Sequence, residues 1–233
     1  MDHDNTRNLM RQTPQPPVDR PNVSPAVIRR LPRYFSYLRE LIRQGKLRIS
    51  SGELSKLMGV TASQIRQDLN CFGGFGQQGY GYNVNYLYEN ICELLGVDAG
   101  LQAVIIGAGD LGRALVRAPM FEKRGVNIIS MFDVDPALIG RTVGGVLIRD
   151  MTELEKFCAE ITVDMAVLTL PKESVDEVAE RLMDCGLRGF WNFMGKDLNL
   201  DPTRAVVENV HLGDSLMILN SKLCQPLGDD KLG

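Results

Sequence analysis

Apolar residues in the first part of the chain recur at three- and four-residue spacing, which predicts helices. The first such pattern begins at Ser24-Pro25 and continues to about Gly45. A serine followed by proline is typical of a helix start, because the serine side chain can cap the helix and proline fits its first position. Pro32 lies inside the pattern and should bend the helix or divide it in two.

Two shorter helical patterns follow, each introduced by a residue that can cap a helix. Ser50 and Ser51 precede a pattern that stops at Gly59, and Thr61 precedes a second one over residues 62–72. Two short helices joined by a tight turn are typical of the helix-turn-helix motif, whose second helix enters the major groove of DNA. An ordinary polar helix surface is the alternative interpretation. The outward face of the second helix carries Ser63, Gln64, Arg66 and Gln67, which can bond base edges or phosphates.

A segment rich in glycine and aromatic residues, residues 73–82, comes directly after the second helix. It holds five glycines and three aromatic residues, and alternating residues around glycines predict a β-hairpin. In this position the hairpin would form the wing of a winged helix-turn-helix, although similar hairpins also occur as inert loops. The candidate DNA contacts of this half are Arg48, Ser50, Ser51, Thr61, Ser63, Gln64, Arg66, Gln67, Gln77, Gln78 and Tyr80.

The pattern changes in the second half, where short apolar runs alternate with helical segments. A helix over residues 86–95 leads into this half. Alternation of strands and helices predicts a parallel sheet with helices on both faces, which is an α/β fold. The order of the strands does not follow from the pattern. The predicted strands are 102–106, 126–132, 164–170 and 189–193, with extended segments at 145–148 and 206–210, and the predicted helices are 110–123, 152–159 and 173–185.

A glycine motif joins the first of these strands to its helix and predicts a dinucleotide site. In such motifs one glycine makes a tight turn, one lets backbone approach a pyrophosphate, and one lets the helix pack closely on the strand. Asp133 ends the next apolar run. Its separation along the sequence from the last glycine is the one at which a carboxylate accepts from ribose hydroxyls and repels a 2′-phosphate. We therefore expect NADH/NAD+ rather than NADP(H), whereas glycines that merely turn a strand into a helix are the alternative. The candidate cofactor residues are Gly107, Ala108, Gly109, Asp110, Leu111, Gly112 and Asp133.

The last helical pattern has apolar residues on more than one face. It follows Asp214 and Ser215, either of which can cap it, and includes residues 216–219 and Leu223. Such a helix needs more than a local groove to cover it, so a contact with a second subunit is one interpretation. Packing against its own domain is the alternative.

Charge divides the chain into two unlike halves. Residues 1–85 hold twelve Lys and Arg against six Asp and Glu, whereas residues 86–233 hold fourteen against twenty-three. This asymmetry indicates a basic module that meets a polyanion, joined to an acidic module that does not. Residues 1–22 are polar and rich in proline, which is typical of a disordered tail rather than a signal sequence. No apolar run is long enough to span a membrane, so we expect a cytoplasmic protein.

Five cysteines are scattered along the chain without any C-x-x-C pair. This spacing indicates neither a disulfide framework nor a zinc site. We therefore interpret them as reduced thiols that mostly pack in the protein interior, and we expect no metal.

Several motifs taken together resemble one known family. They are IRRLPRY (28–34), RISSGEL (48–54), QIRQDL (64–69), FGGFG (72–76), GYGY (79–82), GAGDLG (107–112), FDVDP (132–136), GFWNF (189–193) and NV (209–210). The chain resembles the bacterial redox-sensing transcriptional repressors of the Rex family over roughly residues 24–223. The resemblance implies a homodimer whose winged-helix domains bind a palindromic operator and whose Rossmann domains sense NADH/NAD+, with NADH releasing the DNA. It also implies that the last helix crosses to the partner subunit, and that Thr169 and Pro171 lie in the nicotinamide-side loop.

The resemblance and the patterns together predict four segments. They are a disordered tail (1–22), a winged helix-turn-helix DNA-binding domain (23–85), a Rossmann dinucleotide-binding domain (86–211), and a C-terminal dimerisation helix with a tail (212–233). Some positions depart from the family pattern. Gln67, Gln77 and Gln78 stand where the family has basic residues, which predicts weaker attraction to phosphates. Ala118 and His211 replace a Tyr and an Asp near the nicotinamide end. His211 is either a substitute contact that titrates near neutral pH or an exposed linker residue.

Two other functions fit parts of the pattern. One is an NAD-dependent dehydrogenase with an accessory N-terminal domain. Hydride transfer commonly needs a general acid or base near the nicotinamide, yet the only histidines are His3 and His211 and there is no Tyr-x-x-x-Lys. The sequence therefore disfavours an enzyme. The other is a regulator that responds to CoA or a different nucleotide through the same frame.

Overall fold

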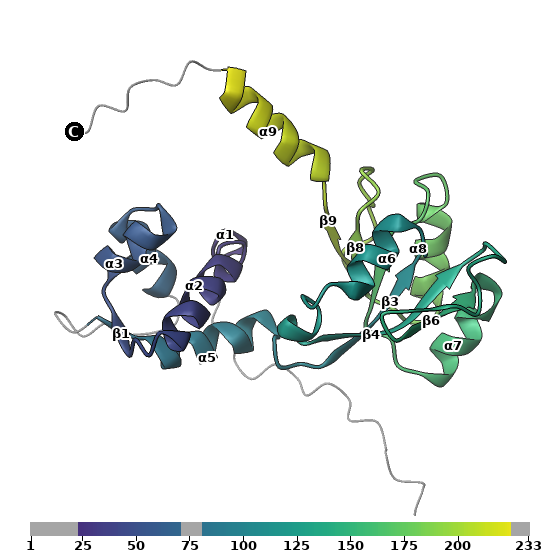
Figure 1. Cartoon of the computed structure of the whole chain (residues 1–233), viewed down its shortest axis with the longest axis horizontal. Helices are drawn as coiled ribbons and strands as arrows, with labels where there is room; N and C mark the ends of the chain where they lie inside the picture. Colours follow the sequence, from purple (N-terminus) through teal and green to yellow (C-terminus); the bar gives the residue numbers. More distant parts are fainter. Residues whose placement is uncertain (1–22, 71–80, 225–233) are drawn as a thin grey trace, which may run out of the picture. The chain divides into compact units, whose positions relative to one another are not determined.

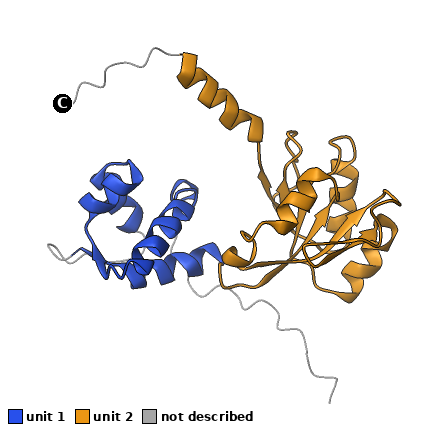
Figure 2. Ribbon diagram, viewed as in Figure 1, with its two compact units in different colours: residues 1–96 blue, residues 97–233 orange. Residues whose placement is uncertain are grey.

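The computed structural model describes residues 23–70 and 81–224 of the chain. These residues belong to two compact units, residues 1–96 and 97–233 (Figure 2). The disordered tail expected over residues 1–22 lies outside the described residues, as does the expected wing with Gln77, Gln78 and Tyr80.

The first unit is built mainly of helices around a small apolar core. A short antiparallel strand pair, in which Arg48 lies opposite Asn83, ties the start of the helix-turn-helix to the residues that follow it. Fully buried side chains of the helices, among them Leu31, Leu54 and Ile65, form the core. Its elements are α1 (Pro25–Ile28), α2 (Leu31–Arg43), β1 (Arg48–Ile49), α3 (Ser51–Met58), α4 (Ala62–Asn70), β2 (Tyr82–Asn83) and α5 (Val84–Leu95).

The predicted helix starts of this unit are confirmed. The Ser24 hydroxyl accepts from the backbone N–H of Val27 at 3.4 Å, and Pro32 accompanies a break between α1 and α2. Ser50 forms a capping box, in which its hydroxyl accepts from the N–H of Glu53 at 3.1 Å and the Glu53 carboxylate accepts from the Ser50 N–H at 2.8 Å. Thr61 also caps α4, because its hydroxyl accepts from the N–H of Gln64 at 3.1 Å.

The boundary between the units lies further along the chain than the sequence indicated. Helix α5 was expected to lead the second domain from residue 86, but the structure divides the chain between Gly96 and Val97. The reason is the apolar face of α5, on which Leu87 and Ile91 are fully buried. This helix packs against α2, and its Tyr88 ring stacks on that of Phe35 at 5.3 Å between centroids.

The second unit is a seven-stranded sheet with the strand order β5-β6-β4-β3-β7-β8-β9 (Figure 1). All neighbours are parallel except β5, which pairs antiparallel with β6 at the edge. Numbered along the chain, the six parallel strands have the order 3-2-1-4-5-6, which is that of a Rossmann fold. The strands are β3 (Leu101–Ile106), β4 (Val126–Asp133), β5 (Thr142–Val143), β6 (Val146–Asp150), β7 (Met165–Leu168), β8 (Gly189–Asn192) and β9 (Val206–Asn209).

Helices cover both faces of this sheet and enclose two apolar layers. One layer lies under α7 (Leu154–Glu160) and α8 (Val175–Asp184), where Phe157 and Leu182 are buried. The other lies under α6 (Asp110–Arg117) and contains Ile105, Met131 and Phe121. Short 3-10 turns at Glu122–Arg124 and Met151–Glu153 complete the connections.

Helix α6 is shorter than the predicted 110–123. It ends at Arg117, and Ala118 is extended with φ −77° and ψ 125°. Pro119 follows immediately, and a residue before proline avoids the helical region because the proline ring would clash with its backbone. The apolar residues beyond it instead form a turn, in which Phe121 is buried.

Helix α9 (Leu212–Cys224) is exposed along its whole length. It starts earlier than expected, so Asp214 and Ser215 lie in its first turn rather than before it. Its apolar side chains remain open to solvent, with exposed fractions of 58% for Leu216 and 73% for Leu223. The chain's own described residues therefore do not cover α9, contrary to the alternative of packing against its own domain. No helix in the described ranges is long and apolar enough to cross a membrane.

Candidate functional site

The glycine motif forms a tight connection from β3 to α6. Gly107 has φ +99°, and a Cβ there would stand 2.5 Å from the carbonyl oxygen of Thr169. A Cβ on Gly112 would stand 2.1 Å from the carbonyl oxygen of Gly107, whereas one on Gly109 would meet nothing within 4 Å. Gly107 and Gly112 are thus required by the packing of turn and helix, and Gly109 borders open space. The close packing at Gly107 and Gly112 fits the tight turn and the close helix–strand approach that the sequence assigned to them, and the approach of Gly109 to a pyrophosphate stays a prediction.

The start of α6 is open to a ligand. Gly109 is its N-cap and provides no side-chain cap, so the first N–H groups of the helix are available to an anion. Arg113 fastens the turn from behind, since it donates to the carbonyl oxygen of Ala108 at 2.9 Å and to Asp110 at 2.6 Å. The Asp110 side chain points to solvent, and Leu111 is half-buried.

Asp133 stands at the end of β4 beside the glycine turn. One of its carboxylate oxygens accepts from the backbone N–H of Ala108 at 2.5 Å. The other accepts from the N–H groups of Val134 and Asp135 at 2.8 and 2.9 Å. Adjacent parallel strands β3 and β4 end at the same edge of the sheet, which is why residues far apart in sequence meet here. The carboxylate is therefore held next to the glycine turn, and its contact with a ribose stays a prediction.

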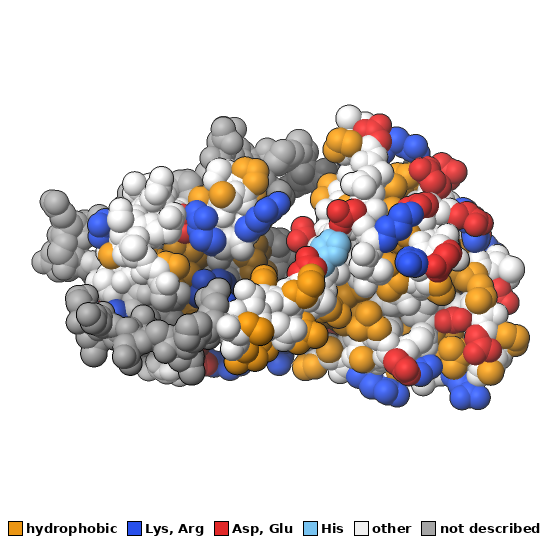
Figure 3. Space-filling view, turned by 90° about the horizontal axis from the view of Figure 1, so that it is seen from above, with side chains coloured by type: hydrophobic (Ala, Val, Ile, Leu, Met, Phe, Trp, Pro, Cys, Tyr) orange, Lys and Arg blue, Asp and Glu red, His pale blue; other side chains and the backbone are white. Residues whose placement is uncertain are grey.

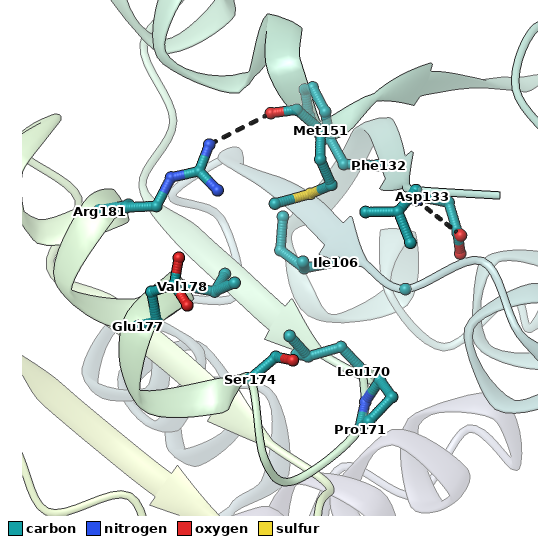
Figure 4. A pocket seen from close by; sticks show the side chains of 12 residues that line it. Ile106, Phe132, Asp133, Met151, Leu170, Pro171, Ser174, Glu177, Val178 and Arg181 are labelled. Atoms are coloured by element: carbon teal, nitrogen blue, oxygen red, sulfur yellow. Dashed lines mark hydrogen bonds between the residues drawn. The ribbon is translucent and has the colours of Figure 1, made fainter. Parts of the chain in front are cut away.

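A cavity of about 270 Å³ opens next to Asp133 and the glycine turn (Figure 4). In this view α8 contributes one wall with Glu177, Val178 and Arg181, and Asp133 lies on the opposite side. The Arg181 guanidinium donates to the carbonyl oxygen of Met151 at 3.3 Å and so closes one end. The lining residues are Ile106, Gly107, Phe132, Asp133, Val134, Met151, Leu170, Pro171, Ser174, Glu177, Val178 and Arg181. A mostly apolar slot with a carboxylate at its mouth suits the adenosine part of a dinucleotide.

The structure separates the predicted cofactor residues by role. Gly107, Asp133 and Pro171 line the cavity. The Thr169 hydroxyl instead shares its one hydrogen between the carbonyl oxygens of Ile106 and Gly107, at 3.1 and 2.8 Å, so it holds the turn in place. The lining residues of α8 were missed, because the sequence does not say which helix faces the end of β4. The strand order decides it, since β7 pairs directly with β3 and places α8 beside the turn.

In the first unit, a buried carboxylate anchors helix α4. Asp68 is fully buried and accepts from Arg30 at 2.6 and 2.8 Å, from Tyr34 at 2.9 Å, and from Gln64 at 2.8 Å. Burial alone would raise the pKa of Asp68, but the hydrogen bonds from Arg30, Gln64 and Tyr34 lower it below its usual value. The predicted recognition helix is thus fixed to the junction of α1 and α2 by a charged contact.

This cluster corrects the expectation for Gln64. The sequence placed it on the outward face as a candidate contact to base edges or phosphates, but it is half-buried and its amide is bound to Asp68. Helical period explains the difference, because Gln64 and Asp68 are one turn apart on the same side of α4. The hydroxyls of Ser50 and Thr61 are likewise engaged as helix caps.

The remaining predicted DNA contacts of α4 are exposed. Ser63, Arg66 and Gln67 lie on its solvent side, and Arg66 donates to the hydroxyl of Ser51 at 3.2 Å. This contact brings α3 and α4 together at the outer surface. Arg48 is also exposed and precedes the capping box. On the face drawn in Figure 3, the first unit shows mainly Lys and Arg among its charged side chains, whereas the second shows both signs.

Two of the residues that depart from the family pattern, Ala118 and His211, lie shortly after α6 and β9. Ala118 is half-buried just after α6. His211, one residue before α9, is bonded to Asp197 at 2.9 Å with its side chain 34% exposed. It is therefore a partnered residue rather than an exposed linker. Among the described residues, no group of three or more His, Cys, Asp or Glu side chains is placed to hold a metal ion.

Comparisons with known proteins agree with this arrangement. Residues 22–70 match a family described as "Putative DNA-binding protein N-terminus", and residues 99–195 match one described as "CoA binding domain". The chain is 48% identical over 206 residues to a protein of Caldicellulosiruptor saccharolyticus and 50% identical over 201 residues to one of Thermoanaerobacter sp.. Both are named redox-sensing transcriptional repressor Rex, and the matches cover 88% and 86% of this chain and 94% and 89% of the relatives. The chain belongs to the Rex family.

Solved Rex structures have the same fold. A crystal structure of RSP in complex with beta-NAD+ and operator DNA matches with a TM-score of 0.81 and 49% identity, covering 86% of this chain and 92% of that chain. A crystal structure of RSP in complex with beta-NADH matches with a TM-score of 0.79 and 46% identity, covering 87% and 94%. The expected order, an N-terminal DNA-binding domain and then a Rossmann-like domain, is confirmed. These Rex relatives are named as transcriptional repressors and not as dehydrogenases.

Proposed function

We propose that this chain represses transcription by binding operator DNA with its first unit and releases the DNA when NADH occupies its second unit. The observation that carries the proposal is the combination of two sites in one chain. One is a helix-turn-helix whose α4 exposes Ser63, Arg66 and Gln67, and the other is a glycine turn with Asp133 held beside it. The Rex relatives, one of them solved with beta-NAD+ and operator DNA, support both halves of the proposal.

The second unit suits NAD(H) rather than NADP(H) or CoA. The Asp133 carboxylate lies next to the open start of α6, where ribose hydroxyls can donate to it. A 2′-phosphate on the same ribose would meet this negative charge, while Arg113 is paired with Asp110 and Arg181 of the cavity wall with Glu155. Gly107 and Pro171 extend the site from the turn toward the loop after β7, where a nicotinamide would lie.

The first unit suits a DNA major groove. Helix α4 is the second of two capped helices and is anchored by Asp68, so its outward side chains are held in a fixed frame. Arg66 and Arg48 supply positive charge to phosphates, and Ser63 and Gln67 supply polar groups to base edges or phosphates. With Gln67 where basic residues are usual, we expect binding that is weaker and less sensitive to salt than in the family at large.

A homodimer provides two such units for a palindromic operator. Helix α9 exposes Leu216, Met217 and Leu223, a surface that water-soluble proteins normally cover. The second unit also has an apolar groove of about 510 Å³, lined in part by Phe121, Phe190 and Trp191. We propose that α9 of one protomer covers apolar surface of the other. Paired units would then read half-sites about 34 Å apart, or a multiple of it, on DNA in the cytoplasm.

Two matched substitutions test the proposal. Asp133→Ala should weaken NADH binding by about tenfold and bring the affinity for NADPH closer to that for NADH. Operator affinity without nucleotide should stay unchanged. Arg66→Ala should weaken operator binding by about tenfold and leave NADH affinity unchanged in the absence of DNA. Fluorescence titration with NADH and NADPH, and fluorescence anisotropy with a labelled operator, measure the two effects. Unaltered binding of both nucleotides by Asp133→Ala would contradict the cofactor assignment.

A further inference from the structure

Helices α7 and α8 carry an ion pair and a thiol pair in matching positions. Both helices connect parallel strands and cover the same face of the sheet, so they run in the same direction. Arg181 of α8 donates from Nε to Glu155 of α7 at 2.8 Å. Cys158 lies one turn beyond Glu155, and Cys185 lies one turn beyond Arg181 at the end of α8. The thiols therefore follow the ion pair along the same seam between the helices.

The two thiols lie close together at this seam, because each follows by one turn a residue of the ion pair that joins the helices. Cys158 and Cys185 also shift each other's pKa, both are half-buried, and neither belongs to a disulfide. Neighbouring thiols on two adjacent helices are candidates for a disulfide, which needs Cα atoms about 4.4–6.8 Å apart. Cys158 packs against the buried layer under α7 and α8, whereas Cys185 is the less buried of the two.

The surroundings keep both thiols protonated under ordinary conditions. Burial raises the pKa of Cys158 to about 11, and the neighbouring Cys185 and Glu155 add to the effect. Burial and the charge of Glu155 also raise the pKa of Cys185, with Asp184 adding and Arg181 opposing. A protonated thiol is a poor nucleophile, so the pair should stay reduced in a reducing cell interior and react only when an oxidant accumulates.

The seam is connected to the candidate dinucleotide pocket. Arg181 binds Glu155 beside the thiols and also donates to the carbonyl oxygen of Met151 at 3.3 Å, and Arg181 and Met151 both line the cavity. Glu177 and Val178, one turn back on α8, line the same wall (Figure 4). A covalent link between α7 and α8 would therefore fix the spacing of the elements that form this wall.

We propose that Cys158 and Cys185 are a redox-active thiol pair, which a small disulfide converts to a disulfide bridge between α7 and α8. The Cys185 thiolate attacks one sulfur of the small disulfide RSSR, forms a mixed disulfide and releases RS⁻. The Cys158 thiolate then attacks the Cys185 sulfur of this mixed disulfide and releases the second RS⁻. The two cysteines lose two electrons and two protons, and RSSR becomes two RSH. The bridge gives the pocket wall a second, thiol-based response to oxidising conditions.

Peptide mapping after oxidation tests the chemistry. The full chain carries Cys224→Ser, because Cys224 is exposed and would react by itself. It is treated with oxidised glutathione at about pH 9, where more thiolate is present, then alkylated and digested with trypsin. Cleavage gives peptides 157–172 and 182–188, each with one of the two cysteines. We expect these peptides joined by a disulfide that dithiothreitol removes. Recovery of both as separate alkylated or glutathione-bearing peptides would overturn the proposal.

Single variants distinguish this two-step exchange from random oxidation. In Cys158→Ser, Cys185 should accumulate as a stable glutathione adduct, because no second thiol displaces it. In Cys185→Ser, Cys158 should remain mostly free, because it is the more buried thiol. Equal glutathione adducts on the two single variants would contradict the assigned order of attack.

The link to the pocket rests on the proposed function and has its own measurement. NADH is titrated against the reduced and the bridged protein. The Kd should differ by at least about threefold, and the double variant Cys158→Ser/Cys185→Ser should have one Kd under both treatments. Equal Kd values for the two forms of the bridging protein would overturn the link to the pocket. Absence of NADH binding in both forms would contradict the proposed function, whereas the thiol chemistry is judged by the peptide map.

Discussion

The two units differ in how several of their helices begin, although α2 of the first unit has no side-chain cap and Asp150 of the second unit caps a 3-10 turn. In the first unit a side chain caps the start of α1, α3, α4 and α5, and the capping residues are Ser24, Ser50, Thr61 and Asn83. In the second unit, Gly109 and Ser174 stand at the starts of α6 and α8, and neither provides a side-chain cap. Ser174 lines the cavity, and Gly109 lies two residues after Gly107, which also lines it.

This difference indicates that helix starts contribute to folding stability in the first unit and to ligand binding in the second. A side-chain cap contributes about 1 kcal/mol to the free energy of unfolding, because it satisfies a backbone N–H that would otherwise lack a partner. The first unit is small and uses such caps throughout the described helix-turn-helix. The second unit has a larger parallel sheet and leaves N–H groups of α6 open, where an anionic ligand can satisfy them. The same backbone feature therefore serves folding in one unit and ligand binding in the other.

The largest expected effect comes from filling the glycine turn. Gly112→Ala places a Cβ 2.1 Å from the carbonyl oxygen of Gly107 and 2.9 Å from Oγ1 of Thr169. Since backbone cannot move aside cheaply, α6 must shift away from β3. We expect the free energy of unfolding of the second unit to fall by about 3 kcal/mol and NADH binding to be lost. Urea unfolding followed by fluorescence of the single tryptophan, Trp191 of the second unit, measures the first effect.

Gly109→Ala is the matched control for that substitution. Its Cβ would meet nothing within 4 Å, and φ at Gly109 is −65°, which any residue adopts. Stability should stay within about 0.5 kcal/mol of the original chain. NADH affinity should nevertheless fall by about tenfold, because the added methyl group stands where a pyrophosphate would approach. Full NADH affinity in this variant would refute the assignment of the α6 start as the phosphate site.

The second effect concerns the buried carboxylate of the first unit. Asp68→Ala leaves Arg30 and Tyr34 without their buried acceptor and should lower the free energy of unfolding of the first unit by about 3 kcal/mol. Operator binding should be lost, because α4 is no longer held, while NADH affinity stays unchanged. Circular dichroism during urea unfolding should show an early transition that Trp191 fluorescence does not share. A single shared transition at the original midpoint would contradict the role given to Asp68.

The smallest effect is a pH dependence at the α3 cap. Hydrogen bonds from Lys46, and then from Ser50, lower the pKa of Glu53 to about 2 from the usual 4.5. The resulting stabilisation is present above pH 4.5 and is lost as the pH falls toward 2. Because the side chain is 51% exposed, Glu53→Gln should cost only about 0.5 kcal/mol at neutral pH. That cost should disappear toward pH 2. The exposed control Glu89→Gln should have no such cost at neutral pH. A cost for Glu53→Gln that persists at low pH would count against the cap.

Much of the fold follows from local features of the sequence. Ser24, Ser50 and Thr61 lie where caps were expected, and every predicted strand of the second unit is present with small shifts at its ends. Capping and apolar periodicity depend on neighbours within one turn or strand, so a single sequence carries them. Pro119 also indicates the end of α6, but the apolar period continues past it, and for that reason the helix was predicted too long.

The features that the sequence did not reveal depend on long-range packing. The period of α4 leaves open whether Gln64 faces solvent or the junction of α1 and α2, and only the burial of Asp68 decides it. The pocket wall from α8 depends on β7 pairing with β3. The alternation of strands and helices along the sequence does not determine this strand order. Likewise, α5 looked like the start of the second domain until its apolar face was seen to pack on α2.

The central claim is that NADH in the second unit weakens DNA binding by the first. The most direct test is operator binding by the full chain at one fixed salt concentration, measured by fluorescence anisotropy across graded ratios of NADH to NAD+. The account predicts that NADH lowers operator affinity progressively, and that saturating operator lowers NADH affinity by the same factor, because the coupling of two sites is reciprocal. Identical operator binding curves at every ratio, from a protein that demonstrably binds NADH, would contradict it.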